Sequence, residues 1–174
     1  MMFYTIGHSN RPLEEFLAIL KAYQIGTIAD IRSLPGSNKY PHFNSENLSK
    51  ILSENGLQYF WIPKLGGLRR SRKDFPSRNT GLTSPSFRSY ADYMATEDFR
   101  KGVQELIELA FESTTAYMCA EAVYWRCHRR LLSDYLVAHG MQVSHIFSLK
   151  EVKPHSMTQG SVVTNEGLVV YPPL

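Results

Sequence analysis

The sequence has only two cysteines among its 174 residues, too few for the disulfide framework of a small secreted domain. We therefore expect a reducing, cytoplasmic environment. No apolar stretch approaches the roughly 18–20 residues that a membrane-spanning helix needs, and the opening MMFYTIGHSNRP lacks the basic and then apolar pattern of a secretory signal. These absences predict a soluble protein with no membrane partner.

An excess of charge of one sign is also missing, because the formal net charge is only +3 at pH 7. Such a mild balance says little about partners unless the charges cluster. Hydrophobic residues make up 43% of the chain, which excludes a disordered or fibrous protein. A length of 174 residues is typical of one domain with a substantial core.

Short apolar runs rich in β-forming residues alternate with stretches of helical spacing. The clearest helical spacing runs from Phe99 to Phe111, after Thr96 and two acids that favour a helix start. The expected strands are residues 3–7, 27–31, 57–62, 115–118 and 143–147. The expected helices lie within residues 12–26, 44–56, 96–111 and 131–140.

This alternation predicts βαβ units and therefore a parallel sheet. The tail, SVVTNEGLVVY, reads as a hairpin over about residues 161–171 with Gly167 in the turn. We expect an α/β fold: a single three-layer, Rossmann-like domain over residues 1–174, with a mostly parallel five-stranded sheet, helices on both faces and a C-terminal β-hairpin. A basic insertion loop is expected over about residues 63–88.

Polar residues follow four of the five predicted strands. In parallel sheets the ligand crevice lies beyond the carboxyl ends of the strands, so residues from distant segments are expected to meet there. The candidate catalytic residues are Cys119, Glu121, Cys127, His128 and Asp30. The candidate substrate-binding residues are His8, Ser9, Asn10, Arg32, Ser33, Gly66, Gly67, Arg69, Arg70 and Arg129.

Several of these residues also have a purely structural interpretation. Asn10 can cap the first helix. Asp30 can form an ion pair with a basic residue, and Asp30 and Arg32, two positions apart on a strand, share a face. The pair Gly66 and Gly67 can be an ordinary turn rather than a phosphate cradle.

The two cysteines differ in their predicted surroundings. Cys127 recurs with apolar residues at i+4 and i+8, on the stripe that faces the sheet, where cysteine packs as a small apolar residue. Cys119 lies where a strand leaves the core, so a helix dipole and nearby arginines can lower its pKa. His128 is a candidate general acid or base, and Glu121 can orient a partner or accept a proton.

Three other chemistries use residues of the same stretch. Zinc-compatible ligands are Cys119, Cys127, His128 and His8, but the C-x7-C-H spacing differs from the usual ligand pairs, so no metal site is predicted and the cofactor stays unknown. A redox disulfide between the two cysteines stays open, although they do not form a CxxC pair. The loop AEAVYW lacks glycine, contains Glu121 and places Arg126 one residue too late for the anion cradle of cysteine phosphatases and rhodaneses.

The segment from Lys64 to Arg88 holds seven basic residues and one acid, Asp74. Two phenylalanines interleave with the charges, a pattern suited to phosphate contacts and base stacking. The plain alternative is a solvated loop, but long loops in compact domains are commonly lids or binding arms. Its position beyond the third strand predicts a clamp over the crevice for a nucleotide, a nucleic acid or a phosphorylated metabolite.

The stretches TIGHSNRPLEEF, DIRSLPGS, GGLRRSRKD, SFRSYADYM and CAEAVYWRCHR, with the tail from HSMT to VVYP, together resemble the bacterial family called domain of unknown function 488. The resemblance extends over nearly the whole chain, and CAE followed by CHR is its most specific part. It implies a single α/β domain but no activity. The motif positions it marks are Glu121, Cys127, His128 and Arg129, with Asp30, Arg32 and Ser33; many relatives carry proline where this chain has Tyr124.

These observations favour an enzyme, a thiol- or carboxylate-dependent hydrolase or transferase acting on an anionic nucleotide, nucleic-acid or phosphorylated substrate. Arg32 and Arg129 would bind the anion through their planar guanidinium groups, and a cysteine would act as nucleophile or redox group. Alternatively, Asp30 and Glu121 form a carboxylate pair for hydrolysis, including glycosidic cleavage.

The alternative function is a non-catalytic nucleic-acid or nucleotide binding module, in which the same residues form a structural polar network. In that case, phosphate contacts would come from the basic loop. Charge reversal there would weaken oligonucleotide binding and flatten its salt dependence. The residues for that test are Arg69, Arg70, Arg72 and Lys73.

Overall fold

The computed structural model describes residues 1–36, 38–71 and 73–174, and it shows an α/β fold built on a six-stranded sheet. The strand order is β3-β2-β4-β1-β5-β6. Strands β1 to β5 run parallel, and β6 pairs antiparallel with β5. The strands are β1 (Met2–Gly7), β2 (Thr27–Asp30), β3 (Gln58–Trp61), β4 (Thr115–Cys119), β5 (Gln142–Ile146) and β6 (Val152–Pro154).

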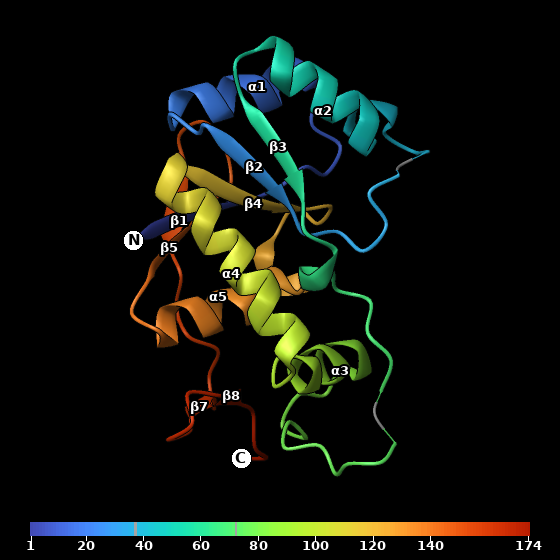
Figure 1. Cartoon of the computed structure of the whole chain (residues 1–174), viewed down its shortest axis with the longest axis vertical. Helices are drawn as coiled ribbons and strands as arrows, with labels where there is room; N and C mark the ends of the chain where they lie inside the picture. Colours follow the sequence, from blue (N-terminus) through green and yellow to red (C-terminus); the bar gives the residue numbers. More distant parts are fainter. Residues whose placement is uncertain (37, 72) are drawn as a thin grey trace.

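Helices and a small C-terminal hairpin, β7 (Val162–Val163) with β8 (Val169–Val170), complete the fold (Figure 1). The α-helices are α1 (Leu13–Ala22), α2 (Ser45–Glu54), α3 (Pro85–Tyr93), α4 (Glu97–Glu112) and α5 (Arg129–Ala138). Three short 3-10 helices are η1 (Pro41–Phe43), η2 (Pro63–Leu65) and η3 (Tyr124–Arg126). Within the described part of the chain, no helix combines the length and the apolar character needed to cross a membrane.

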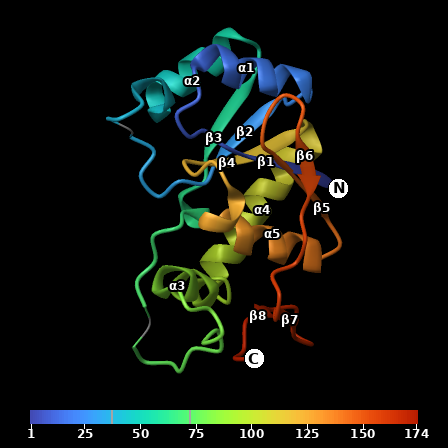
Figure 2. The same ribbon diagram turned by 180° about the vertical axis from the view of Figure 1, so that it is seen from behind.

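The sheet separates two hydrophobic clusters, because successive residues of a strand point to opposite faces. Ala116 and Met118 of β4 belong to the cluster with α1 and α2, whereas Tyr117 between them belongs to the cluster with α4 and α5. Figures 1 and 2 show these two helix pairs on opposite sides of the sheet. Each fully buried Leu, Ile or Phe side chain in such a cluster contributes roughly 1.5–3 kcal/mol relative to an exposed position.

Side-chain caps fix the starts of three helices. Asn44 caps α2, Ser84 caps α3 and Thr96 caps α4, each through an oxygen that accepts a backbone N–H of the first turn. Asn10 does not cap α1, because the residue before that helix is Pro12 and no side chain makes the capping bond. The capping interpretation of Asn10 is therefore wrong.

The five predicted parallel strands are all present, but the sequence analysis missed α3 and β6. Helix α3 begins where the predicted irregular stretch ends, and its buried residues, 89–91, are consecutive rather than spaced along one stripe. Strand β6 is an exposed edge strand that ends in Pro154, so it shows no alternation of apolar and polar residues. Neither element carries the periodic pattern from which sequence-based predictions are made.

Backbone hydrogen bonds continue past the ends of β1 and β4 and bring distant segments together. The N–H groups of His8 and Ser9 donate to the carbonyl oxygens of Cys119 and Ala120 at 2.9 and 3.0 Å. Gly7, the last residue of β1, lies directly under the loop after β4. A Cβ atom at Gly7 would lie 1.6 Å from the carbonyl oxygen of residue 121. Only glycine therefore lets that loop cross the end of β1.

We expect Gly7→Ala to lower the free energy of unfolding by about 1–3 kcal/mol or more, the cost of overpacking against an atom that cannot move freely. Urea denaturation measures the change. Gly36→Ala is the matched control, because its Cβ would meet no atom closer than 3.8 Å, and its effect should stay within about 0.5 kcal/mol. Equal stabilities of the two variants would contradict this account of the loop crossing.

Candidate functional site

The two cysteines lie in contact at the carboxyl end of the sheet. Cys119 is the last residue of β4, and Cys127 follows η3 just before α5. Their Sγ atoms are 3.0 Å apart and neither forms a disulfide. Cys119 is 2% exposed and Cys127 7% exposed. The fold therefore unites the two thiols that the sequence separates by seven residues.

Arg129, the first residue of α5, lies against both sulfur atoms. Its Nε donates to Sγ of Cys119 at 3.0 Å and to Sγ of Cys127 at 3.3 Å. Its two terminal nitrogens donate to Thr5 Oγ1 at 3.0 Å and to the carbonyl oxygen of Glu121 at 2.7 Å. The side chain is 1% exposed. Among the ion pairs of the described residues, none joins Arg129 to a carboxylate.

These contacts separate the acidities of the two thiols. Burial opposes ionisation of Cys127, but the Cys119 thiol and the Arg129 guanidinium and backbone N–H outweigh it and lower the pKa of Cys127 to about 6. Burial and the hydrogen bond to Cys127 raise the pKa of Cys119 well above its ordinary value. These opposite shifts make Cys127 the thiol of the pair that ionises first.

The position of Cys127 at the start of α5 adds to this effect. The backbone N–H of Arg129 donates to Sγ of Cys127 at 3.4 Å, and His128, the residue before the helix, provides no side-chain cap. A helix N-terminus carries free N–H groups and a partial positive charge, both of which favour an anion. Sγ of Cys127 thus takes the place that a capping oxygen usually takes.

His128 is held as a neutral ring beside the cysteines. Burial lowers its pKa to about 4, and its Nε2 lies 2.7 Å from the carbonyl oxygen of Ile31, so Nε2 carries the proton and donates. Its Nδ1 faces Gly67, where a Cβ atom would lie 2.6 Å from that nitrogen. The ring therefore connects β2 and the glycine pair to the start of α5.

Asp30 and Arg32 form a buried ion pair beside this centre. Arg32 donates to Asp30 through Nε at 2.9 Å and through a terminal nitrogen at 2.6 Å, and the Tyr59 hydroxyl also donates to the carboxylate. Asp30 is fully buried. His8, whose pKa burial lowers to about 4, accepts from Arg32 at Nε2 over 3.2 Å. Both carboxylate oxygens of Asp30 therefore accept hydrogen bonds. This arrangement agrees with the structural role of Asp30 as the partner of a basic residue.

A cleft of about 270 Å³, here called the cysteine cleft, opens above the sulfur atoms. It is formed by the segments after β2 and β4, by α3 and by the start of α5, which the ribbon in Figure 2 shows at one end of the sheet. Its lining residues are Arg32, Ser33, Leu34, Gly67, Leu68, Ser86, Phe87, Tyr90, Cys119, Ala120, Glu121, Arg126, Cys127 and His128. Seven of the predicted site residues therefore meet in one hollow.

Other predicted binding residues lie around an adjacent hollow or outside both. His8 and Ser9 line a second depression next to the cysteine cleft, and Arg32 and Glu121 border both. Asn10 is exposed and accepts a 3.4 Å hydrogen bond from the Ser9 hydroxyl. The predicted crevice is thus two neighbouring hollows rather than one.

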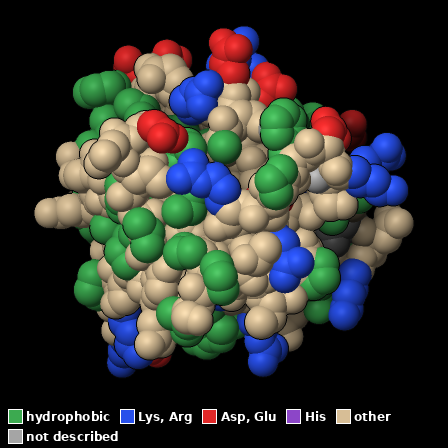
Figure 3. Space-filling model, turned by 90° about the horizontal axis from the view of Figure 1, so that it is seen from below, with side chains coloured by type: hydrophobic (Ala, Val, Ile, Leu, Met, Phe, Trp, Pro, Cys, Tyr) green, Lys and Arg blue, Asp and Glu red, His purple; other side chains and the backbone are tan. Residues whose placement is uncertain are grey.

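The basic loop, residues 63–88, uses part of its charge to hold its own shape. Arg69 donates to the carbonyl oxygens of Gly66 and Pro63 at 3.0 and 2.7 Å and lies 3.8 Å from the ring centre of Tyr93. Arg70 is exposed, and Arg72 lies outside the described residues. Figure 3 shows Lys and Arg side chains scattered over this end of the molecule rather than gathered in one patch, with most of the Asp and Glu side chains near the top of the view.

The glycine pair packs against the site rather than cradling a ligand. A Cβ atom at Gly66 would lie 2.4 Å from Ser33 Oγ, and the Ser33 hydroxyl also accepts the backbone N–H of Leu68 at 2.9 Å. Gly67 packs in the same way against His128. Through these contacts the start of the basic loop packs on the end of β2 and forms one wall of the cysteine cleft.

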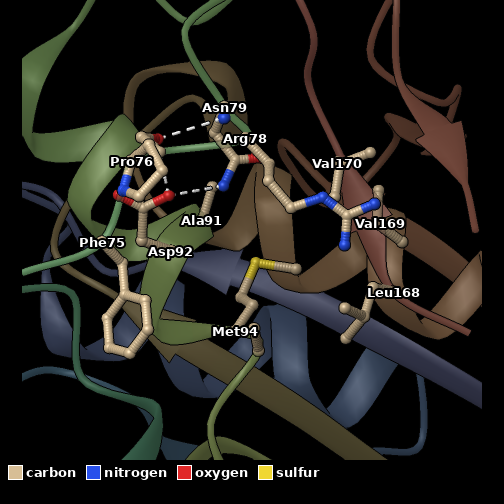
Figure 4. A pocket seen from close by; sticks show the side chains of 12 residues that line it. Phe75, Pro76, Arg78, Asn79, Ala91, Asp92, Met94, Leu168, Val169 and Val170 are labelled. Atoms are coloured by element: carbon tan, nitrogen blue, oxygen red, sulfur yellow. Dashed lines mark hydrogen bonds between the residues drawn. The ribbon is translucent and has the colours of Figure 1, made fainter. Parts of the chain in front are cut away.

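A separate hollow of about 230 Å³ lies between the basic loop, α3 and the C-terminal hairpin (Figure 4). At its edge Asp92 accepts hydrogen bonds from Ser77 and Asn79, both at 2.7 Å. Asn79 in turn accepts the backbone N–H of Tyr171 at 3.0 Å. None of the predicted site residues lines this hollow, so we attribute it to the packing of the loop on the hairpin.

A buried hydrogen-bond chain, which sequence reasoning missed, runs from Arg129 to Asp134. Arginine can only donate hydrogen bonds, so the Thr5 hydroxyl accepts one from Arg129. The same hydroxyl donates a hydrogen bond to Nδ1 of His145 at 2.6 Å. Nε2 of His145 then donates to Nδ1 of His155 at 2.8 Å, and Nε2 of His155 donates to Asp134 at 2.7 Å. The contacts of this chain thus follow one donor-to-acceptor direction.

Other groups complete the buried chain. Asp134 is fully buried and also accepts the backbone N–H of Thr158 at 2.9 Å and the Tyr171 hydroxyl at 2.7 Å. Burial and the neighbouring His155 lower the pKa of His145 to about 2, and the Tyr124 ring stacks on it at 3.6 Å between ring centres. Thr5 lies in the TIGH stretch and His155 in the HSMT stretch. These two stretches are the signal in the sequence from which the hydrogen-bond chain could have been predicted.

A ligand cluster for a metal is not found in this region. Among residues 1–36, 38–71 and 73–174, no group of three or more His, Cys, Asp or Glu side chains is arranged to hold a metal ion. The two histidines among the zinc-compatible residues make other hydrogen bonds. His8 accepts one from Arg32, and His128 donates one to a backbone carbonyl oxygen.

A family model described as "Domain of unknown function DUF488" matches residues 12–136. The match covers more than two thirds of the chain and includes the loop from β4 to α5 with both cysteines and Arg129. The TIGH stretch and the tail from His155 lie outside it, although both contributed to the resemblance described above. No curated protein and no solved structure matches the chain.

We expect Asp134→Asn to destabilise the protein, because the amide cannot accept from all the donors that meet at the carboxylate. Leaving buried donors unsatisfied costs about 1–3 kcal/mol each. Asp74→Asn, at an exposed position of the basic loop, is the matched control and should change the unfolding free energy by less than about 0.5 kcal/mol. Chemical denaturation compares the two; a stability of Asp134→Asn equal to that of the wild type would mean that the buried chain is not a structural requirement.

Proposed function

The chain belongs to the family described as domain of unknown function DUF488, and we propose that this member is a thiol-dependent enzyme. In this proposal Cys127 is the nucleophile, and its substrate is anionic. The cysteine cleft is the binding site, and Arg129 holds the nucleophile in its charged state. A reducing cytoplasm, the compartment predicted from the two cysteines, would keep both thiols available.

The observation that carries the proposal is the environment of the Arg129 guanidinium. A buried charge is costly unless an opposite charge and hydrogen bonds compensate it. The other partners of Arg129 are a hydroxyl and a carbonyl, both neutral, and the sulfur atoms are its only contacts that can ionise among the described residues. A thiolate is therefore the counterion that this site requires, and a thiolate is the reactive form of cysteine.

The cysteine cleft supplies the means to select an anionic substrate. Arg126 is exposed at its rim, whereas Arg32, which also lines the cleft, is buried and paired with Asp30. Phe87, which is half-buried, gives one wall an aromatic surface. Glu121 also lines the cleft and opposes an anion, so selectivity for a ligand with an apolar body and a negative group rests on Arg126.

The geometry also supports the following roles in a reaction. Sγ of Cys127 attacks an electrophilic atom of the substrate, and the Cys119 thiol, 3.0 Å away, is the nearest group that can give a proton to the leaving group. Neutral His128 donates its Nε2 proton in a hydrogen bond to the Ile31 carbonyl oxygen. It therefore orients the start of α5 and takes no part in proton transfer. Transfer of the bound group to water would make the enzyme a hydrolase, and transfer to another acceptor would make it a transferase.

The alternative of a non-catalytic nucleotide or nucleic-acid binding module rests on the basic loop. Arg70 and Lys73 are exposed there and available to phosphates, whereas Arg69 is held by the loop's own carbonyl groups. A purely binding role gives no reason for a buried guanidinium set between two sulfur atoms. We therefore favour the enzyme.

The proposal predicts that an anionic alkylating reagent is selected over its neutral counterpart. We expect the rate ratio of iodoacetate to iodoacetamide at Cys127 to exceed the ratio for a free thiol such as glutathione. Arg126→Gln should lower this ratio by roughly fivefold, the effect of about 1 kcal/mol between unit charges about 4 Å apart in water. Mass spectrometry identifies the alkylated residue and measures both rates.

Arg100→Gln, an equal change of charge on the exposed surface of α4, is the control and should leave the ratio unaltered. Cys127→Ser should remove the fast alkylation altogether. Slow modification of Cys127 by both reagents, at the rate of an ordinary thiol, would overturn the proposed nucleophile. A ratio that Arg126→Gln does not change would overturn the anionic substrate.

A further inference from the structure

We propose that Cys119 is a resolving thiol, so that the cysteine cleft reduces small anionic disulfides through a Cys119–Cys127 disulfide. This inference rests on the proposed function, because it needs Cys127 as the nucleophile. It adds a reaction type, a two-electron reduction, and a substrate class, a disulfide that carries a negative group on an apolar body.

The contact between the two sulfur atoms carries the inference. They lie 3.0 Å apart, so a bond of about 2.05 Å requires an approach of about 1 Å. Both cysteines border the same cleft, so a group bound to Cys127 stands beside the Cys119 thiol. A hydrolase needs a water molecule beside the group bound to Cys127. In this cleft the Cys119 thiol, a second nucleophile, occupies that position.

The reaction balances with the groups present in the cleft. The Cys127 thiolate attacks one sulfur of the substrate disulfide; the S–S bond of the substrate breaks, and one half leaves as a thiolate. Cys119 then attacks Sγ of Cys127, which forms the intramolecular disulfide and releases the second half as a thiolate. The proton of Cys119 passes to a departing thiolate. Two electrons move from the pair of cysteines to the substrate, and an external dithiol restores the reduced pair.

Arg129 favours the reduced state, which assists the return half of the cycle and restricts the disulfides that the pair can reduce. In the reduced pair the buried guanidinium has a thiolate as counterion, but in the disulfide both sulfur atoms are neutral. Arg129 is then left without an anion in the interior, a costly state. A disulfide whose reduced form is selectively stabilised is strongly oxidising and easily reduced, so an external dithiol readily restores the pair. The same stabilisation makes the reduced pair a weak reductant, so its substrates are disulfides that release stable thiolates, such as aryl disulfides.

The lining of the cleft identifies the substrate class. Arg126 provides an exposed positive charge at the rim, and Leu68 and Phe87 provide apolar surface. Dithiobis(nitrobenzoate), an aryl disulfide with a carboxylate on each ring, has this chemistry and releases a coloured thiolate. It is therefore the probe for the test.

The experiment mixes the reduced full-length protein, freed of reductant, with an equimolar amount of the probe. We expect each probe molecule to release both of its coloured halves, and intact mass measurement to show a chain that has lost two hydrogens and carries no adduct. Cys119→Ser should release one half per probe and keep the other half bound at Cys127. Cys127→Ser should react at a small fraction of the wild-type rate.

The outcomes separate this inference from the proposed function. A stable probe adduct at Cys127 in the wild type would overturn the role of Cys119 while leaving Cys127 as the nucleophile. Slow reaction of both the wild type and Cys119→Ser would overturn the nucleophile itself. The wild-type result decides without either variant if a serine substitution prevents folding, and circular dichroism checks the fold of both variants.

Discussion

The buried positive charge of Arg129 is the constraint around which the carboxyl end of the sheet is organised. Its guanidinium lies under the loop after β4 and contacts residues of β1, β4 and the start of α5. A cation in this position is tolerated only with an anion beside it, and we propose that the Cys127 thiolate fulfils that role. Gly7 makes the arrangement sterically feasible, because the carbonyl that accepts from Arg129 crosses directly over it.

The same side chain connects the site to the tail of the protein. Through Thr5, His145 and His155 the buried chain reaches Asp134, which also holds Tyr171 near the C-terminal hairpin. Arg129 and Asp134 lie within the residues matched by the family model, but their partners on β1, β5 and the tail lie outside it. The tail is thus part of the support of the site and not an appendage to the matched region.

The sequence predicted the parallel sheet and the convergence at its carboxyl end because these depend on local patterns, namely β-rich apolar runs and the residues that follow them. The helical spacing of Cys127 correctly predicted its burial. The expectation that Cys119 has the lowered pKa was wrong, because Arg129 and the start of α5 lower the pKa of Cys127, whereas burial raises that of Cys119. What the sequence could not reveal was the pairing of groups far apart along the chain. Thr5 and Arg129 are separated by 124 positions and Thr5 and His145 by 140, and nothing in their neighbourhoods marks Arg129 as a buried residue rather than a surface ligand for a substrate.

Ionisation of Cys127 is the central claim, and a pH titration of the ultraviolet absorbance of thiolate tests it most directly. A thiol whose pKa is lowered is protonated below that value and ionised above it. The account predicts a step in wild-type absorbance with its midpoint near pH 6 that is absent from Cys127→Ser and moves to higher pH in Arg129→Lys. An absorbance step found only above about pH 8.5, the range of an ordinary cysteine, would contradict it.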